Sequence, residues 1–213
     1  MRNIPQNIED FIYLISKIGF APLRGLLLYP FLAKGSKLPF LGYAAKIIKP
    51  SKIKFGKNVW IGNSVYIDAF SHYGIILKDG VTIRENSTIQ CRSGLNVPGE
   101  SLVIGMNTFI GPCSKIGVGG KIIIGDNCQV GAHCCMNAES HSYHNGSFTT
   151  GKTIRKGIVI GDNVWIGDGV TILDGVVIGS NSVIGAGSVV NKNIETAKVY
   201  AGVPAVEITV KKN

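Results

Sequence analysis

The residues best suited to chemistry lie in a polar segment between Met136 and Ile158, which reads NAESHSYHNGSFTTGKTIRKG. The segment holds two of the four histidines, His141 and His144, together with Glu139 and several hydroxyl residues. Histidine is the side chain best suited to take up and release a proton near neutral pH. A polar loop of this length that leaves a regular framework is more often functional or disordered than structural filler. The segment is therefore the first candidate for a catalytic site.

The framework that must position this segment follows it directly. Every sixth residue is aliphatic over a run of five repeats, at Ile160, Ile166, Ile172, Ile178, Ile184 and Val190. A helix would need apolar residues three and four apart, and a half-buried strand would need them two apart. A period of six indicates one short strand and one turn per unit, stacked as a solenoid. The spacing predicts a prism of β-strands, but it does not define the hand of the coil.

The other positions of each hexad agree with this interpretation. With the aliphatic residue counted as first, the fourth position holds residues that tolerate positive φ, and these predict left-handed corners at Asn163, Gly169, Gly175, Asn181, Gly187 and Asn193. The fifth position holds small side chains that fit inside a narrow coil, at Val164, Val170, Val176, Ser182 and Ser188. The third position begins Asp162, Asp168 and Asp174, which suits a solvated turn.

The same period recurs earlier in the chain. It is present at Phe55, Ile61 and Ile67, at Ile104, Ile110 and Ile116, and at Ile124, Val130 and Met136. Cys128 and Cys134 occupy the small inward position. We therefore expect a β-helix over residues 51–206, with excursions at about 91–101 and 137–157 and a tail at 207–213. Each excursion should leave the coil at a corner, where it does not disturb the stacked strands.

Residues 1–50 have a different composition. The segment 11–32 is strongly apolar but is interrupted by Lys17, Pro22, Arg24 and Pro30. A membrane span needs about 20 apolar residues with few or no charges, so this segment is a poor candidate. We expect two short helices that cap the open end of the coil. The alternative is an interfacial anchor, with Lys17, Arg24, Lys34 and Lys37 facing anionic headgroups.

Length and charge limit the possible functions. The 213 residues fit one domain with an appendage, and 22 Lys and Arg against 13 Asp and Glu leave a net charge of +9. Such a balance favours a polyanionic partner, but the chain has no nucleic-acid-binding motif, so a phosphorylated small molecule or an anionic membrane is the better candidate. Five cysteines with no paired framework, and no visible signal peptide, indicate the cytoplasm.

The run IGDNVWIGDGVTILDGVVIGSNSVIGAGSVVNK, the later AGVPA and the histidine-bearing loop before them resemble the hexapeptide-repeat acyltransferases. Within that family they are most similar to the O-acetyltransferases of bacterial surface polysaccharides and to galactoside and maltose acetyltransferases. The resemblance is good over residues 100–206, weaker over 51–99 and only suggestive before that. It implies an all-β, left-handed parallel β-helix, a homotrimer, acetyl-CoA as donor, a sugar acceptor that is lipid- or nucleotide-linked, and sites between subunits.

The resemblance also assigns roles to residues. His141 matches the catalytic histidine and would be the general base, with Glu139 orienting the imidazole or stabilising its protonated form. His144 is the competing base, and with Tyr143 it is a candidate for contacting the acceptor. The candidates for binding acetyl-CoA are Trp165 and Asp168 beside the pantetheine arm, Gly185 and Ala186 at main-chain contacts, and Asn191 and Lys192 near the phosphates.

Two departures from the family pattern concern the acceptor and the phosphates. Ser142 follows His141 where galactoside and maltose relatives carry proline, which favours the polysaccharide group. Val206 and Glu207 follow Ala205 where relatives carry a basic residue. The basic contact to CoA would then come from Lys192, Lys198, Lys211 or Lys212.

Three alternatives remain open. The first is an N-acetyltransferase that acts on an amino sugar or a nucleotide-sugar. The second is a zinc enzyme of the carbonic-anhydrase kind, although the histidines lack the spacing of that group and no metal is expected. The third is a β-helix without catalytic activity. Of the remaining histidines, His133 falls at a predicted left-handed corner, and His72 is expected to face solvent or a neighbouring subunit.

Overall fold

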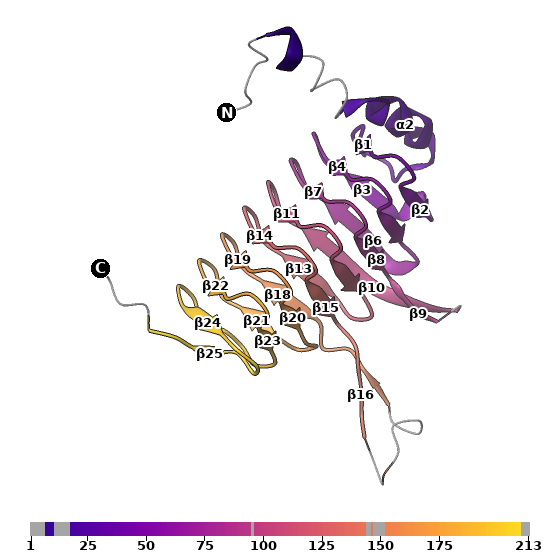
Figure 1. The fold of residues 1–213 in the computed structure, drawn as a ribbon. Helices are drawn as coiled ribbons and strands as arrows, with labels where there is room; N and C mark the ends of the chain where they lie inside the picture. The colour runs from indigo at the N-terminus through magenta and orange to yellow at the C-terminus, as the bar shows by residue number, and fades with distance from the viewer. Residues whose placement is uncertain (1–6, 11–17, 95, 144–145, 147–151, 210–213) are drawn as a thin grey trace.

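The computed structural model describes residues 7–10, 18–94, 96–143, 146 and 152–209. The chain winds into a coil whose three sides are three stacked sheets (Figure 1). Pairing between successive turns of the coil is parallel, for example between Phe109–Ile110 and Gln129–Val130, and in the nine-stranded sheet only the last pair, Val199–Ala201 with Val206–Glu207, is antiparallel. This is the architecture of a left-handed parallel β-helix with a short N-terminal helix, so the predicted fold class is confirmed.

The three sheets are here named A, B and C. Sheet A contains, in spatial order, β1 (Phe40–Leu41), β4 (Trp60–Ile61), β7 (Thr82–Ile83), β11 (Phe109–Ile110), β14 (Gln129–Val130), β19 (Trp165–Ile166), β22 (Val183–Ile184), β24 (Val199–Ala201) and β25 (Val206–Glu207). Sheet B contains β2 (Lys46–Ile48), β5 (Tyr66–Asp68), β8 (Thr88–Gln90), β12 (Lys115–Gly117), β15 (Cys135–Asn137), β20 (Thr171–Ile172) and β23 (Val189–Val190). Sheet C contains β3 (Ile53–Phe55), β6 (Ser71–Leu77), β10 (Val97–Ile104), β13 (Ile122–Ile124), β18 (Ile158–Ile160) and β21 (Val177–Ile178).

The side chains at the first and fifth hexad positions point into the coil, as the sequence predicts. The first-position aliphatics from Ile160 to Val190 and the fifth-position side chains from Val164 to Ser188 are all buried inside the coil. The two inward cysteines, Cys128 and Cys134, are buried as well. One large and one small side chain per strand and turn therefore pack together in the interior of the coil.

The corners also follow the prediction, with one exception. The φ angles are positive at five of the six expected corners: Asn163, Gly169, Gly175, Asn181 and Gly187. Asn193 is the exception and the prediction there is wrong, because its φ is not positive. The hexad period ends after Val190, and the Asn193 side chain instead accepts the Val177 N–H at 2.9 Å.

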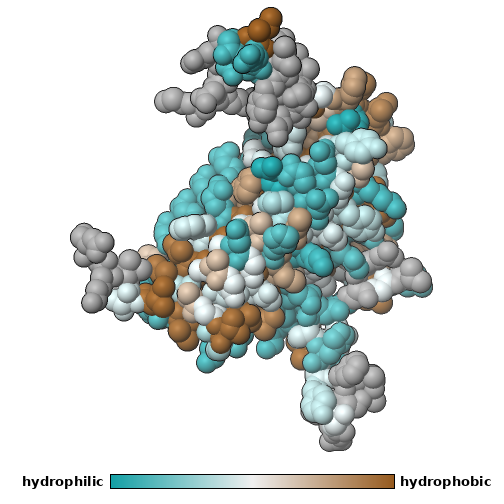
Figure 2. Space-filling view, in the orientation of Figure 1, coloured by the Kyte–Doolittle hydropathy of each residue, from teal (hydrophilic) through white to brown (hydrophobic). Residues whose placement is uncertain are grey.

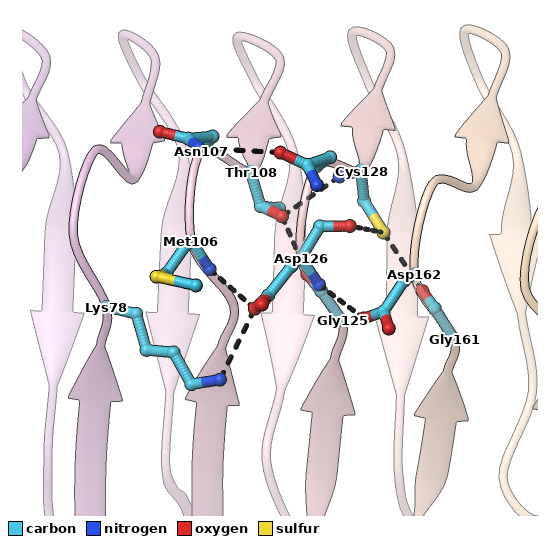
Figure 3. A network of polar contacts seen from close by, with 10 residues as sticks. Lys78, Met106, Asn107, Thr108, Gly125, Asp126, Cys128, Gly161 and Asp162 are labelled. Carbon is cyan, nitrogen blue, oxygen red and sulfur yellow. Dashed lines mark hydrogen bonds and ion pairs between the residues drawn. The ribbon is translucent and has the colours of Figure 1, made fainter.

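Carboxylates in several turns tie one turn of the coil to the next (Figure 3). The Asp126 Oδ1 accepts the Met106 N–H at 2.8 Å, and the Asp162 Oδ1 accepts the Asp126 N–H at 2.7 Å. The Asp168 Oδ1 accepts the Ala132 N–H at 2.8 Å in the same way. The third-position aspartates therefore stabilise the stack through charge-assisted hydrogen bonds, which the expectation of a simple solvated turn missed.

Two excursions leave the coil, both at the corner between sheets B and C. The first is a hairpin in which β9 (Arg92–Gly94) pairs antiparallel with the start of β10. Its second strand belongs to sheet C already at Gly99, so the excursion is shorter than the loop expected to end at residue 101. The second joins β15 to β18 and carries the polar segment. A corner is the place where extra residues leave the stacked strands undisturbed.

The N-terminal end is closed by α2 (Ala21–Leu28), which is followed by a 3₁₀ turn (Tyr29–Phe31); a second 3₁₀ turn (Pro50–Lys52) precedes β3. Residues 8–10 are helical as well, but residues 11–17, where the other predicted helix would continue, lie outside the described residues. Strands β1 and β2 already pair with β4 and β5, so the coil begins before the expected start at residue 51. No helix in the described ranges is both long and apolar enough to cross a membrane.

Candidate functional site

The polar segment forms a two-stranded antiparallel ribbon. Strand β16 (Ser140–His141) pairs with β17 (Thr153–Ile154), with His141 opposite Thr153. The Ser142 N–H continues the pairing with a hydrogen bond of 3.1 Å to the Lys152 carbonyl. Figure 1 shows the ribbon standing away from the coil near β15. His141 therefore lies on a strand at the foot of the ribbon, where its backbone position is defined.

Asp174, one turn of the coil further on, fastens both strands of the ribbon. Its Oδ1 accepts the Gly157 N–H at 2.8 Å and the Lys156 N–H at 2.9 Å. Its Oδ2 accepts the Ser140 hydroxyl at 3.2 Å. Asp174 occupies the same hexad position as Asp162 and Asp168, so the ribbon is held by the device that also joins successive turns of the coil.

Glu139 connects the ribbon to His141. Its Oε2 accepts the Arg155 Nε–H at 2.8 Å, and its Oε1 lies 4.0 Å from the His141 Nε2. The Glu139 side chain is only 14 % exposed, whereas that of His141 is 56 % exposed. The arrangement keeps a fixed negative charge beside an imidazole that solvent or a ligand can reach.

An open pocket of about 450 Å³ lies between the outer face of sheet B and Glu139. Its polar lining comes from side chains that point outward from β8, β12 and β15, namely Thr88, Gln90, Lys115 and Asn137, together with Glu139. Hydroxyl, amide and ammonium groups of this kind can hydrogen-bond the hydroxyls of a polar ligand. The pocket is large enough for one small ligand.

The residues predicted to bind CoA divide between two places in one chain. Trp165 projects from sheet A with a side chain that is 59 % exposed, and Asp168, Gly185 and Ala186 lie in the turns between sheets A and B. The Asp168 carboxylate is engaged with the Ala132 N–H, as described above. Ala186 is exposed, whereas a Cβ at Gly185 would lie 2.8 Å from the Ala201 Cβ, so packing against the next turn already requires glycine there. We call Trp165, Asp168, Gly185 and Ala186 the Trp165 wall. It lies on sheet A and at the corner between sheets A and B, whereas the ribbon lies at the corner between sheets B and C.

Asn191 and Lys192 follow β23 at the corner between sheets B and C, on the same side as the ribbon, and both are exposed. The structure thus brings Glu139 and His141 together and leaves the Trp165 wall apart from them within one chain. Tyr143 is exposed just beyond β16, and His144 lies outside the described residues.

The basic residues named as substitutes for the missing contact after AGVPA differ in their surroundings. The Lys198 Nζ donates to the Glu207 Oε1 at 2.6 Å, and this hydrogen bond with the carboxylate charge raises the pKa of Lys198. Lys198 therefore neutralises the acidic residue that stands where relatives are basic. Lys211 and Lys212 lie outside the described residues, which leaves Lys192 as the exposed candidate.

The two other described histidines, His133 and His72, lie outside the ribbon. His133 adopts a φ of 57°, as predicted for a left-handed corner, and His72 is exposed on β6. Within the described ranges, no three His, Cys, Asp or Glu side chains converge as a metal site would require.

Sequence reasoning missed several residues that build this site. Arg155 is a basic residue in the same polar segment as Glu139, and this opposite charge was the signal for their ion pair. Asp174 carried a signal in its hexad position, but that position suggested solvation rather than a hydrogen bond to the ribbon. The pocket residues Thr88, Lys115 and Cys135 each precede a first-position residue, so the hexad pattern predicts that they point outward but not that they meet one another.

Comparison with known proteins agrees with the repeat pattern. Residues 157–192 match the family model described as bacterial transferase hexapeptide (six repeats), and residues 121–137 match the hexapeptide repeat of succinyl-transferase. No curated protein matches the sequence.

Solved structures share the fold. A crystal structure of a single-site mutant of AntD, an N-acyltransferase from Bacillus cereus, in complex with dTDP-4-amino-4,6-dideoxyglucose and coenzyme A is 19 % identical, covers 90 % of each chain and gives a TM-score of 0.54. Another single-site mutant of AntD, in complex with dTDP and coenzyme A, is 18 % identical, covers 84 % of this chain and 87 % of its own, and gives a TM-score of 0.55.

A maltose O-acetyltransferase from Clostridium difficile is 21 % identical, covers 100 % of this chain and 80 % of its own, and gives a TM-score of 0.49. Residues 121–137 and 157–192 thus carry hexapeptide repeats of the kind described for bacterial transferases, in agreement with the three-sheet coil.

Proposed function

We propose that this chain is a cytoplasmic acyltransferase that moves an acyl group, in the first instance acetyl, from acyl-CoA to a hydroxyl of a surface-polysaccharide sugar. The observation that carries the proposal is the contact at the foot of the ribbon. There the exposed His141 Nε2 lies 4.0 Å from the Glu139 Oε1, and Arg155 holds the other oxygen of that carboxylate. In this geometry His141 can act as a general base while the Glu139 carboxylate, held in place by Arg155, lies beside its imidazole ring.

The reaction needs few protein groups. CoA supplies the acyl group as a thioester. The His141 imidazole takes the proton from the acceptor hydroxyl as the oxygen attacks the thioester carbonyl, and the Glu139 carboxylate stabilises the imidazolium. A C–O bond forms and the C–S bond breaks, and His141 then returns the proton to the departing sulfur. The polar pocket beside Glu139 would hold the acceptor sugar through Thr88, Gln90 and Asn137.

The division of the site between two corners supports a homotrimer. His141 stands at the corner of sheets B and C, whereas Trp165, Gly185 and Ala186 lie on and beside sheet A. If copies pack side by side, the ribbon of one copy faces the Trp165 wall of the next. We therefore propose that CoA lies between two copies, with Lys192 as a candidate contact for its phosphates.

The direct test compares acyl transfer by the wild type, His141→Ala and His144→Ala, with acetyl-CoA and a panel of lipid-linked and nucleotide-linked sugars. We expect His141→Ala to lose about two to four orders of magnitude in rate, the usual worth of a positioned base. His72→Ala is the matched control, because His72 is exposed on sheet C away from the ribbon. A His141→Ala rate within about tenfold of the wild type would contradict the assignment.

The main alternative is transfer to an amine, which is the activity named for AntD. The two products differ in chemistry, because an O-ester is cleaved by alkaline hydroxylamine and an amide is not. Labelled product that loses its acyl group in hydroxylamine supports transfer to oxygen. Product that keeps its label would establish N-acyl transfer instead.

A further inference from the structure

The outer face of α2 is unusual for a surface helix, because its side chains are apolar. Ala21 and Gly25 face the coil, and a Cβ at Gly25 would overlap the Pro39 carbonyl oxygen. The opposite face consists of Leu23, Leu26 and Leu27, and Leu27 is 70 % exposed. A surface helix of a globular protein normally turns polar residues outward. Here the pattern is reversed.

Arg24, the single charged residue of α2, does not make the outer face of the helix polar. The Arg24 Nε–H donates to the Leu41 carbonyl oxygen at 2.8 Å, so its guanidinium lies against the coil rather than beside the leucines. The apolar surface continues on both sides of the helix, through Phe20, Tyr29 and Phe31, all of them exposed. Figure 2 shows the resulting brown area at the upper right, over α2. Exposed apolar patches of this kind mark interaction sites.

A group of lysines adjoins this apolar face. The segment after the 3₁₀ turn runs beside β3, with the Ala33 N–H bonded to the Ile53 carbonyl at 3.2 Å and the Lys37 N–H bonded to the Phe55 carbonyl at 2.7 Å. This pairing sets Lys34 and Lys37 next to Lys54 of β3. All three side chains are exposed.

The lysines rim an open pocket of about 460 Å³. Lys37, Lys54, Lys57 and Lys78 line it, and Ile76 and Met106 form part of its apolar wall. One acidic residue, Asp79, also lines it, and its Oδ1 is occupied by the Lys57 N–H at 2.8 Å. Lys78 is paired with Asp126 at 3.3 Å, so the other three lysines stand against the single Asp79 carboxylate and the rim keeps a positive charge.

The charge of the whole chain is concentrated in this region. Residues 11–67 contain eight lysines, one arginine and no Asp or Glu. The other 156 residues hold 13 basic and 13 acidic residues, so they are neutral in sum. The net charge of +9 thus belongs entirely to the end of the chain that bears α2. Charge gathered in one region, and absent elsewhere, indicates a function for that region rather than a general need for solubility.

We propose that this N-terminal docking surface, made of the α2 face with Phe20, Tyr29 and Phe31 and the adjoining Lys34, Lys37, Lys54 and Lys57, binds an anionic lipid bilayer. The leucines and aromatics enter the headgroup region, and the lysines meet the lipid charges. Lipid is the occupant that complements both parts of the surface at once. A second copy packed face to face on it would bring lysines against lysines, which opposes association.

The test measures flotation of the full chain with phosphatidylcholine vesicles and with vesicles that also contain phosphatidylglycerol. We expect binding to the anionic vesicles that weakens with salt. A variant carrying Lys34→Gln, Lys37→Gln, Lys54→Gln and Lys57→Gln should bind about tenfold more weakly or worse. A Leu23→Ser and Leu27→Ser variant should also lose binding, because the inserted apolar area is smaller.

Matched controls are Lys121→Gln and Leu173→Ser, which change an exposed lysine and an exposed leucine elsewhere on the coil and should bind as the wild type does. Circular dichroism confirms that each variant is folded, and size-exclusion chromatography reports its oligomeric state. Absence of binding to anionic vesicles, or equal binding by the four-lysine variant, would overturn the proposal. A lower oligomeric state in the leucine variant would overturn it too, because the face would then be a subunit interface. Acyl transfer to a water-soluble acceptor should be unchanged in both variants, so this test is independent of the proposed catalysis.

Discussion

The coil from Ile160 to Val190 and the ribbon from Ser140 to Ile154 lie side by side but are built in opposite ways. In the coil every hexad buries an aliphatic residue, and successive turns are joined by carboxylates such as Asp162. In the ribbon the strands are two residues long and exposed or half-buried, and their stability depends on Asp174 and on the Glu139–Arg155 pair. The difference separates two tasks: apolar burial makes the coil rigid, and a few polar contacts position His141.

The largest effect should come from a cavity in the coil. Ile166 is fully buried on β19, so Ile166→Ala should lower the free energy of unfolding by about 2–5 kcal/mol. Ile154→Ala removes the same atoms from a half-buried position on β17 and should cost less than about 1 kcal/mol. Urea unfolding followed by circular dichroism measures both. Equal losses would show that the ribbon and the coil share one core, contrary to the comparison above.

Asp174→Ala should separate stability from activity. We expect a loss of about 1–2 kcal/mol in unfolding free energy, because the hydrogen bonds to the ribbon are lost, and a fall in kcat for acyl transfer of about tenfold or more. Asp162→Ala is the matched control, since it removes the same kind of hydrogen bond within the coil. It should cost similar stability while transfer changes by less than about threefold. If both variants lose activity alike, Asp174 has no special role at the ribbon.

The smallest expected effect is a loss of unfolding free energy at alkaline pH. Burial, together with the nearby Asp68 charge, raises the pKa of the Cys91 thiol from 9.0 to about 12. Because the folded state favours the protonated thiol, its contribution to stability is complete below pH 9 and is lost as the pH rises from 9 towards 12. Between about pH 8 and pH 10 this amounts to roughly 1 kcal/mol.

Cys91→Ala should remove that part of the pH dependence, measured as unfolding free energy at several pH values. Burial also raises the pKa of Cys128 and Cys134, so some alkaline loss should remain in the variant. The polar segment contains no cysteine, and the effect therefore belongs to the coil. An unchanged pH dependence in Cys91→Ala would assign the alkaline loss to other groups.

Much of the coil could be predicted from the sequence because its period is local. A first-position isoleucine and a fifth-position valine bury themselves wherever the hexad recurs, and asparagine or glycine turns each corner. The prediction failed at Asn193, where the period had already ended. The site was less predictable, since its contacts cross turns of the coil. Arg155 meets Glu139 only because β16 and β17 pair, and Asp174 reaches Ser140 only because the next turn stacks beneath the ribbon.

The sequence by itself thus determined that the chain coils with a period of six and that its polar chemistry is concentrated between Met136 and Ile158. It also determined that all the excess positive charge lies between residues 11 and 67. Only the tertiary structure decided that the ribbon and the Trp165 wall stand at different corners, and that α2 turns leucines outward beside a lysine rim. The physical reason is that periodic burial depends on neighbours along the chain, whereas corners, pockets and faces depend on which turns stack on one another.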